Sequence, residues 1–182
     1  MARPRGRRER PPLDRERLNE LALTYVGRFA TTRAKLASYL ARKVRERGWE
    51  GEAPPDIESI ADRLASLGYV DDSAYALSKS RSLTARGYGA RRVRDSLRAA
   101  GVAEEDSEDA RELAESEKVE AALRFARRRR IGPFGNGVPG QADRQRAIAA
   151  MVRAGHSFSL AKAILSLEPG ENPDIAMLAE NA

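Results

Sequence analysis

The chain has 182 residues, of which 41% are hydrophobic, 33% are charged and only 5% are aromatic. It has no cysteine and one histidine, which excludes disulfides, thiolate or multi-histidine metal sites and cysteine nucleophiles. The net charge of +6 favours polyanions or acidic protein surfaces as partners. No apolar run approaches the roughly 18 residues of a membrane span, so we expect a cytoplasmic protein that does not cross a membrane.

The N-terminal residues differ in composition from the rest of the chain. Five arginines and three prolines lie within residues 1–12. Such a segment buries no apolar surface and repels itself, so it is typical of disorder. We expect a disordered basic arm over residues 1–17, ahead of the first apolar period at Leu18.

From Leu18 onward, apolar residues recur with the period of a helix, and no segment shows sustained period-2 alternation. Glycines, prolines and capping residues divide this pattern into segments. The sequence therefore predicts an all-α chain of nine helices. The first begins at Leu18, and the others cover about 32–48, 57–67, 71–87, 90–100, two helices within 103–130, 143–154 and 157–168.

The nine predicted helices fall into three groups of three. The glycines that end the middle helices, Gly48, Gly101 and Gly155, are 53 and 54 residues apart. A constant period indicates stacked repeats, although a single bundle with a chance period is the alternative. The predicted repeats cover 18–68, 69–112 and 113–168, followed by a C-terminal tail over 169–182.

The helix expected over 90–100 has a basic side and an apolar side. Arg91, Arg94 and Arg98 lie opposite Val93 and Leu97 on a helical wheel, and only Asp95 offsets their charge in the sequence. Guanidinium groups suit phosphates and carboxylates, although a solvated helix face is the alternative. The other two middle helices repeat the pattern with Lys35, Arg42 and Arg45, and with Arg146 and Arg153. The candidate binding residues are Arg81, Arg86, Arg91, Arg94, Arg98, Arg127, Arg128, Arg146 and Arg153.

Three other features point away from catalysis. Residues 135–140 match the letters of the dinucleotide fingerprint, but an Arg-rich helix precedes them where a strand is required, so we expect a loop and no cofactor. Asp71 and Asp72 are expected to cap a helix, because no histidine or third acid stands nearby to complete a metal site. His156 is expected to be a turn residue.

Two motifs between residues 57 and 102, where the likeness is strongest, resemble the signature of the bacterial regulatory protein RecX family. The first is Leu64-x-x-x-Gly68-Tyr69-Val70-Asp71-Asp72-x-x-Tyr75-Ala76. The second is Arg86-Gly87-Tyr88-Gly89-x-Arg91-Arg92-Val93-x-x-x-Leu97-x-x-x-Gly101-Val102. The resemblance extends over about residues 18–168 and is looser in the third repeat.

The resemblance implies three tandem three-helix repeats in an elongated, curved molecule. It also implies a monomeric, non-enzymatic modulator of the RecA recombinase, usually an inhibitor, acting in DNA repair and homologous recombination. Such a protein lies in the groove of the RecA–DNA filament and lowers ATP hydrolysis, strand exchange and filament growth. Its expected partners are the RecA filament and, weakly and without sequence preference, single-stranded and duplex DNA.

Two other classes of function stay open at this level. A general DNA-binding regulator could use the helices over 71–87 and 90–100 as a helix-turn-helix, because a short turn with glycines joins them. An enzyme of unknown type is the third possibility, although the residues of this sequence barely support a catalytic constellation.

Overall fold

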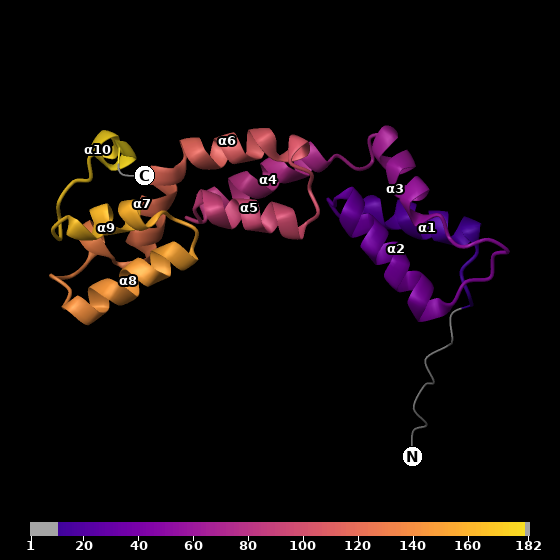
Figure 1. Cartoon of the computed structure of the whole chain (residues 1–182), viewed down its shortest axis with the longest axis horizontal. Coiled ribbons are helices and arrows are strands. Elements are labelled where there is room, and N and C mark those ends of the chain that lie inside the picture. The colour runs from indigo at the N-terminus through magenta and orange to yellow at the C-terminus, as the bar shows by residue number, and fades with distance from the viewer. Residues whose placement is uncertain (1–10, 181–182) are drawn as a thin grey trace, which may run out of the picture. The chain divides into compact units, whose positions relative to one another are not determined.

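The structure is a computed structural model that describes residues 11–180, and its regular elements there are helical apart from one isolated bridge (Figure 1). The predicted all-α class is confirmed. In chain order the elements are α1 (Arg15–Val26), α2 (Arg33–Arg47), α3 (Ile57–Ser66), α4 (Asp72–Ala85), α5 (Ala90–Ala99), η1 (Glu105–Ser107), α6 (Glu108–Ser116), α7 (Lys118–Arg129), η2 (Gly132–Phe134), α8 (Gln141–Arg153), α9 (Phe158–Ser166) and α10 (Ile175–Glu180).

The chain divides into two compact units, residues 1–71 and residues 72–182. The first unit has one apolar core, built by α1, α2 and α3. The second unit has two cores, one among α4, α5 and α6 and one among α7, α8, α9 and α10. Each predicted three-helix repeat therefore has a core of its own, and the second and third repeats pack together as one unit. The expected curvature of the whole molecule stays a prediction.

Residues just before α1 belong to the folded first unit. Leu13 is fully buried, its N–H donates to the Gly48 carbonyl at 3.0 Å, and its carbonyl accepts from Glu50 N at 2.9 Å. Asp14 caps α1 by accepting from Arg17 N at 2.8 Å. The expectation of a disordered arm up to residue 17 is thus wrong over 13–17, because a buried leucine and a helix cap hold this segment. Residues 1–10 lie outside the described residues.

The ends of the second and third repeats also differ from expectation. Helix α6 continues to Ser116, beyond the predicted boundary at 112, and Glu117 separates it from α7. The predicted C-terminal tail contains α10, whose Leu178 is buried in the core of the third repeat. Its six residues are too few for a periodic apolar pattern to be recognised in the sequence.

The turn between α4 and α5 is also where the third repeat contacts the second. Gly89 N donates to the Ala154 carbonyl at 3.0 Å, and Arg91 N donates to the Gly155 carbonyl at 3.3 Å. A Cβ atom at Gly89 would overlap the Gly155 carbonyl, and one at Gly87 would lie 2.8 Å from Phe125 N. We call this backbone crossing of Gly87, Gly89 and Gly155 the glycine junction. It fixes α5 against the end of α8.

A pair of glycine substitutions tests the junction. Gly89 and Gly140 are both helix N-caps with extended backbone, but nothing lies within 4 Å of a Cβ built at Gly140. Replacing either glycine by alanine removes the same favourable N-cap residue, so both variants lose the same capping free energy. Any further loss of stability in Gly89→Ala therefore reports the overlap with Gly155. We expect Gly89→Ala to lower the free energy of unfolding by about 1–3 kcal/mol more than Gly140→Ala. Chemical denaturation followed by circular dichroism measures both, and equal losses would contradict the close approach.

Candidate functional site

Helix α5 has the two-sided character that its sequence predicts. Val93 and Leu97 are buried in the core of the second repeat, while Arg91, Arg94 and Arg98 are exposed. The six other candidate arginines are exposed as well, namely Arg81, Arg86, Arg127, Arg128, Arg146 and Arg153. Exposure alone does not make a site, so the arrangement of these side chains decides which of them can act together.

The glycine junction brings arginines of the second and third repeats into one place. A shallow hollow there is lined by Arg91, Arg92, Asp95, Val152, Arg153 and Gly155. Three arginines from two repeats, Arg91, Arg92 and Arg153, thus line one hollow together with a single acid, Asp95. We call this the basic hollow, and phosphates or protein carboxylates suit it as ligands.

A second groove adjoins the basic hollow. Its lining includes the cations Arg91, Arg94 and Lys118, the acid Glu115, and Phe158 at the N-terminus of α9. Phe158 is 63% exposed, which is unusual for a phenylalanine. The sequence analysis missed Arg92, Lys118 and Phe158, because their proximity to Arg91 comes from the packing of two repeats and leaves no mark in the spacing.

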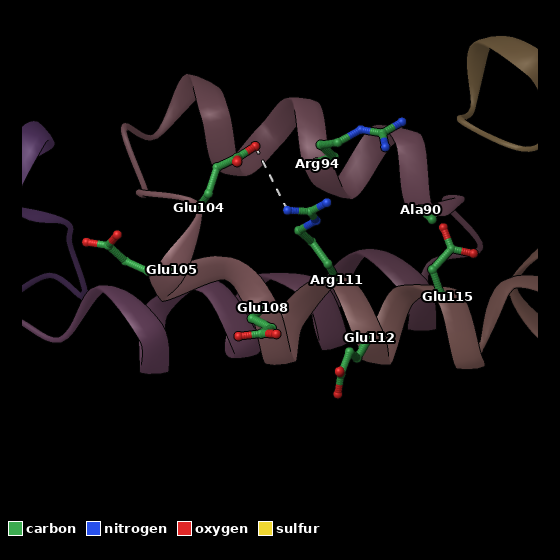
Figure 2. Close-up of a pocket in the computed structure, with 8 residues that line it drawn as sticks. All are labelled: Ala90, Arg94, Glu104, Glu105, Glu108, Arg111, Glu112 and Glu115. Atoms are coloured by element: carbon green, nitrogen blue, oxygen red, sulfur yellow. Dashed lines mark ion pairs between the residues drawn. The ribbon is translucent and has the colours of Figure 1, made fainter.

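On its other side, α5 borders an acidic groove (Figure 2). Arg94 shares this groove with Arg111 of α6. The acids that line it are Glu104, Glu105, Glu108, Glu112 and Glu115. Arg111 Nη1 lies 4.0 Å from Glu104 Oε1, an exposed and therefore weak ion pair. Asp95 is the one acid among the α5 arginines in the sequence, and folding adds acids of α6 to the surroundings of Arg94.

The arginines at the end of α7 make contacts within the second unit. Arg127 lies over the Phe134 ring at 4.8 Å, and Arg128 lies over the Phe125 ring at 5.6 Å. Arg128 also donates to the Arg86 carbonyl, one residue before the glycine junction. These contacts hold the guanidinium groups in place by cation–π and hydrogen-bond attraction, so Arg128 helps to fasten the third repeat to the second.

The remaining candidates lie apart from the basic hollow. Arg146 Nη1 forms an ion pair with Asp143 Oδ1 at 3.0 Å on the surface of α8. Arg81 and Arg98 are exposed on α4 and α5, and neither lines the basic hollow. The structure therefore divides the predicted arginines, and Arg91 and Arg153 are the two that line the basic hollow, one from each repeat.

The first unit carries the third set of predicted cations. Lys35 and Arg45 line a groove together with Arg42 and several aromatic rings. Arg42 Nη1 lies 2.8 Å from Glu46 Oε1. Hydrogen bonds from Lys43 and Arg42 lower the pKa of Glu46 to about 2, so this carboxylate stays ionised wherever the protein is folded near neutral pH.

His156 is buried behind the basic hollow, where the sequence suggested a turn residue. It lies 5.6 Å from the Phe125 ring, and its Nε2 donates to the Gly87 carbonyl at 3.1 Å. Its Nδ1 is buried and has no hydrogen-bond partner among the described residues. The aligned glycines give a sequence signal for the burial of His156. The residues that follow Gly48, Gly101 and Gly155 are Trp49, Val102 and His156. Trp49 and Val102 pack against cores, and His156 packs at the glycine junction.

Neither a metal centre nor a membrane span is seen in the described part of the chain. Residues 11–180 hold no group of three or more histidine, cysteine or acidic side chains placed to bind a metal ion. None of the helices there is long and apolar enough to cross a bilayer. The candidate binding sites of these residues are grooves lined by charged and aromatic side chains.

The fold and the basic hollow define an all-helical repeat protein with a surface suited to anionic partners. Residues 71–110 match a family model described as "RecX, second three-helix domain". "Regulatory protein RecX" from Myxococcus xanthus is 35% identical over 164 residues, which cover 84% of this chain and 86% of that protein. Its namesake from Agrobacterium fabrum is 29% identical over 148 residues, with 79% of each chain covered.

Solved structures agree in fold. "Crystal structure of regulatory protein RecX" aligns with a TM-score of 0.61 at 23% identity, covering 84% of this chain and 71% of that one. "Crystal structure of RecX from Lactobacillus salivarius" aligns with a TM-score of 0.58 at 19% identity, covering 83% and 94%. On the extent and identity of the Myxococcus match, this chain belongs to the regulatory protein RecX family.

The environment of His156 predicts a pH dependence of stability. Burial lowers its pKa from the ordinary value of 6.5, and the hydrogen bond to Gly87 opposes this only in part. Below pH 6.5 the unfolded chain therefore binds more protons at this site than the folded chain does. Stability contributed by the neutral ring is present above that pH and is lost as the pH falls.

We expect the free energy of unfolding of the wild-type protein to fall more than that of His156→Gln between about pH 7.5 and about pH 5.5. Glutamine keeps an N–H donor for the Gly87 carbonyl and does not titrate. Urea denaturation at each pH measures the difference. Parallel curves for the two proteins would show that His156 does not titrate differently on folding.

Proposed function

We propose that this chain is a non-enzymatic regulator of the RecA recombinase that binds the RecA–DNA filament and inhibits it. The observation that carries the proposal is the 35% identity to a protein named "Regulatory protein RecX" along 86% of its length. The second of the two motifs that resemble this family, over 86–102, includes Arg91 and Arg92 of the basic hollow. Binding is proposed to lower ATP hydrolysis, strand exchange and filament growth.

The basic hollow supports contact with a polymer of phosphates and protein carboxylates. Its arginines come from two repeats that the glycine junction holds in one unit, so they meet a partner as a preformed set. A preformed surface loses less conformational entropy on binding than separately mobile groups do. Phosphate contacts of this kind give affinity without sequence choice, as a filament of any DNA sequence requires.

A helix-turn-helix regulator fits the structure less well. That motif reads base edges with the N-terminal residues of its second helix, which here would be α5. The backbone at this end of α5 is packed against the third repeat, because Gly89 N and Arg91 N donate to carbonyls of Ala154 and Gly155. Selection of one duplex sequence in a binding screen would nevertheless favour this alternative.

Paired arginine variants test the basic hollow on DNA alone. Arg91→Gln/Arg153→Gln removes two cations of the hollow, whereas Arg98→Gln/Arg146→Gln removes two outside it from the same helices, α5 and α8. With about three phosphates contacted on a short duplex, the log–log salt slope of the wild type should be about −3. The first variant should lower its magnitude to about 1, and the second should leave it near the wild-type value. Equal effects of the two variants would mean that charge alone matters and its position does not.

The order of addition separates filament binding from competition for DNA. A competitor covers bare strand and fails once RecA has coated it, whereas a filament binder still acts. We expect substoichiometric amounts of this protein to lower the ATPase rate of preformed RecA filaments. Arg91→Gln/Arg153→Gln should weaken the effect several-fold, and Arg98→Gln/Arg146→Gln should retain it. Inhibition seen only when the protein meets the DNA before RecA would reject filament binding.

A further inference from the structure

A groove in the first unit combines stacked aromatic rings with positive charge. Its lining residues belong to α1, to α2 and to the connection between these two helices, whose ribbons are labelled in Figure 1. It is lined by Thr24, Tyr25, Arg28, Phe29, Lys35, Ser38, Tyr39, Arg42 and Arg45. Four of these residues are cations and none is an acid, although Arg42 pairs with Glu46 beside the groove. The three rings are more than half of the aromatic side chains that the first unit carries in residues 11–71.

The three aromatic rings form a cluster in which two rings are stacked and the third, Phe29, is tilted by 47° against Tyr25 and exposed to solvent. Tyr25 and Tyr39 are stacked, with centroids 4.1 Å apart and planes inclined by 18°. Phe29 lies 5.3 Å from Tyr25 and is 56% exposed. The half-buried tyrosines form the inner part of the cluster, and Phe29 presents more than half of its surface to solvent at the outer edge. An exposed ring beside other rings is a surface on which a planar ligand can stack.

The cations are arranged around the rings, where they can meet a charged ligand backbone. Arg42 lies over the Tyr39 ring at 5.5 Å, and its pairing with Glu46 partly neutralises it. Arg28, Lys35 and Arg45 supply the rest of the positive lining. A ligand that fits both features carries planar rings and regularly spaced negative charges.

We propose that this groove binds single-stranded DNA, with one base stacked on Phe29 and neighbouring phosphates beside Lys35 and Arg45. Grooves that combine aromatic platforms with basic side chains are the usual means of binding single strands without sequence choice. Duplex DNA fits poorly, because its bases are already stacked on one another and its rings are not available to Phe29. The site is in the first unit and is tested on bare oligonucleotides, so its outcome is separate from that of RecA regulation. Phe29 does not line the basic hollow, so substitutions of Phe29 separate this site from the hollow.

The test uses the full chain and three labelled probes of equal length: an oligo-dT strand, the same strand with abasic sites throughout, and a duplex. Fluorescence anisotropy at one fixed salt concentration gives the affinity for each. The abasic strand keeps the phosphates and lacks the rings, so wild-type protein should bind it about tenfold more weakly than oligo-dT, the order expected for one lost base–aromatic stack. The duplex should also bind more weakly through this site.

Substitutions locate the stacking on Phe29. Phe29→Ala should bind oligo-dT about tenfold more weakly and should bind the abasic strand as the wild type does. Tyr69→Ala is the matched control, since Tyr69 is 58% exposed in the same unit and does not line the groove. Phe29→Trp should restore or increase the affinity, because a larger ring stacks at least as well. Lys35→Gln/Arg45→Gln should reduce the magnitude of the salt slope on oligo-dT by about 1.4, from about 0.7 for each contact.

Three results would overturn the proposal. The first is equal binding of oligo-dT and the abasic strand by the wild-type protein, which would show that no base is stacked. This measurement uses no variant, so it does not depend on whether a variant folds. Phe29→Ala with wild-type circular dichroism could keep its full affinity for oligo-dT. Tighter binding of the duplex than of oligo-dT, with Phe29→Ala unaffected, would assign DNA contact to charge elsewhere.

Discussion

Backbone atoms of Gly89 and Gly155 approach so closely that no side chain fits between them. This crossing lets the first turn of α5 donate hydrogen bonds to the end of α8, and His156 and Arg128 add bonds to the carbonyls of the preceding turn. The second and third repeats consequently form one unit with two cores. Every charged feature proposed for partner contact in this unit depends on that fixed arrangement.

The same crossing determines which arginines can act together. Arg91 and Arg153 are far apart in the sequence and line one hollow, whereas Arg94 faces the acidic side of α6. Arg94 also lines the second groove, next to Arg91, so it stands between the cations near the junction and the acids of α6. The first unit carries its own cations in a different setting, among exposed aromatic rings, so the two units present different chemistry to the same class of polyanion.

Much of the fold follows from local signals in the sequence, and the site follows from them only in part. Caps such as Thr32 and Ser157, the stop glycines and the apolar period predict the helices, because each acts within one or two turns of the chain. The short α10 and the buried Leu13 lack such a pattern and depend on cores formed by distant residues. The helical wheel correctly predicts that the α5 arginines are exposed. It cannot predict that acids of α6 lie near Arg94 or that Arg153 of α8 lies near Arg91, because both depend on tertiary packing.

Hydrogen exchange of the protein bound to RecA–DNA filaments tests the central claim most directly, namely that the partner contacts the surface around the glycine junction. The account predicts slower exchange of backbone amides in α5 and in the connection between α8 and α9, relative to the free protein. Amides in the exposed loop over 135–140, in the same unit but outside the basic hollow, should exchange at an unchanged rate. Filament binding without added protection in α5 and the α8–α9 connection would contradict the account.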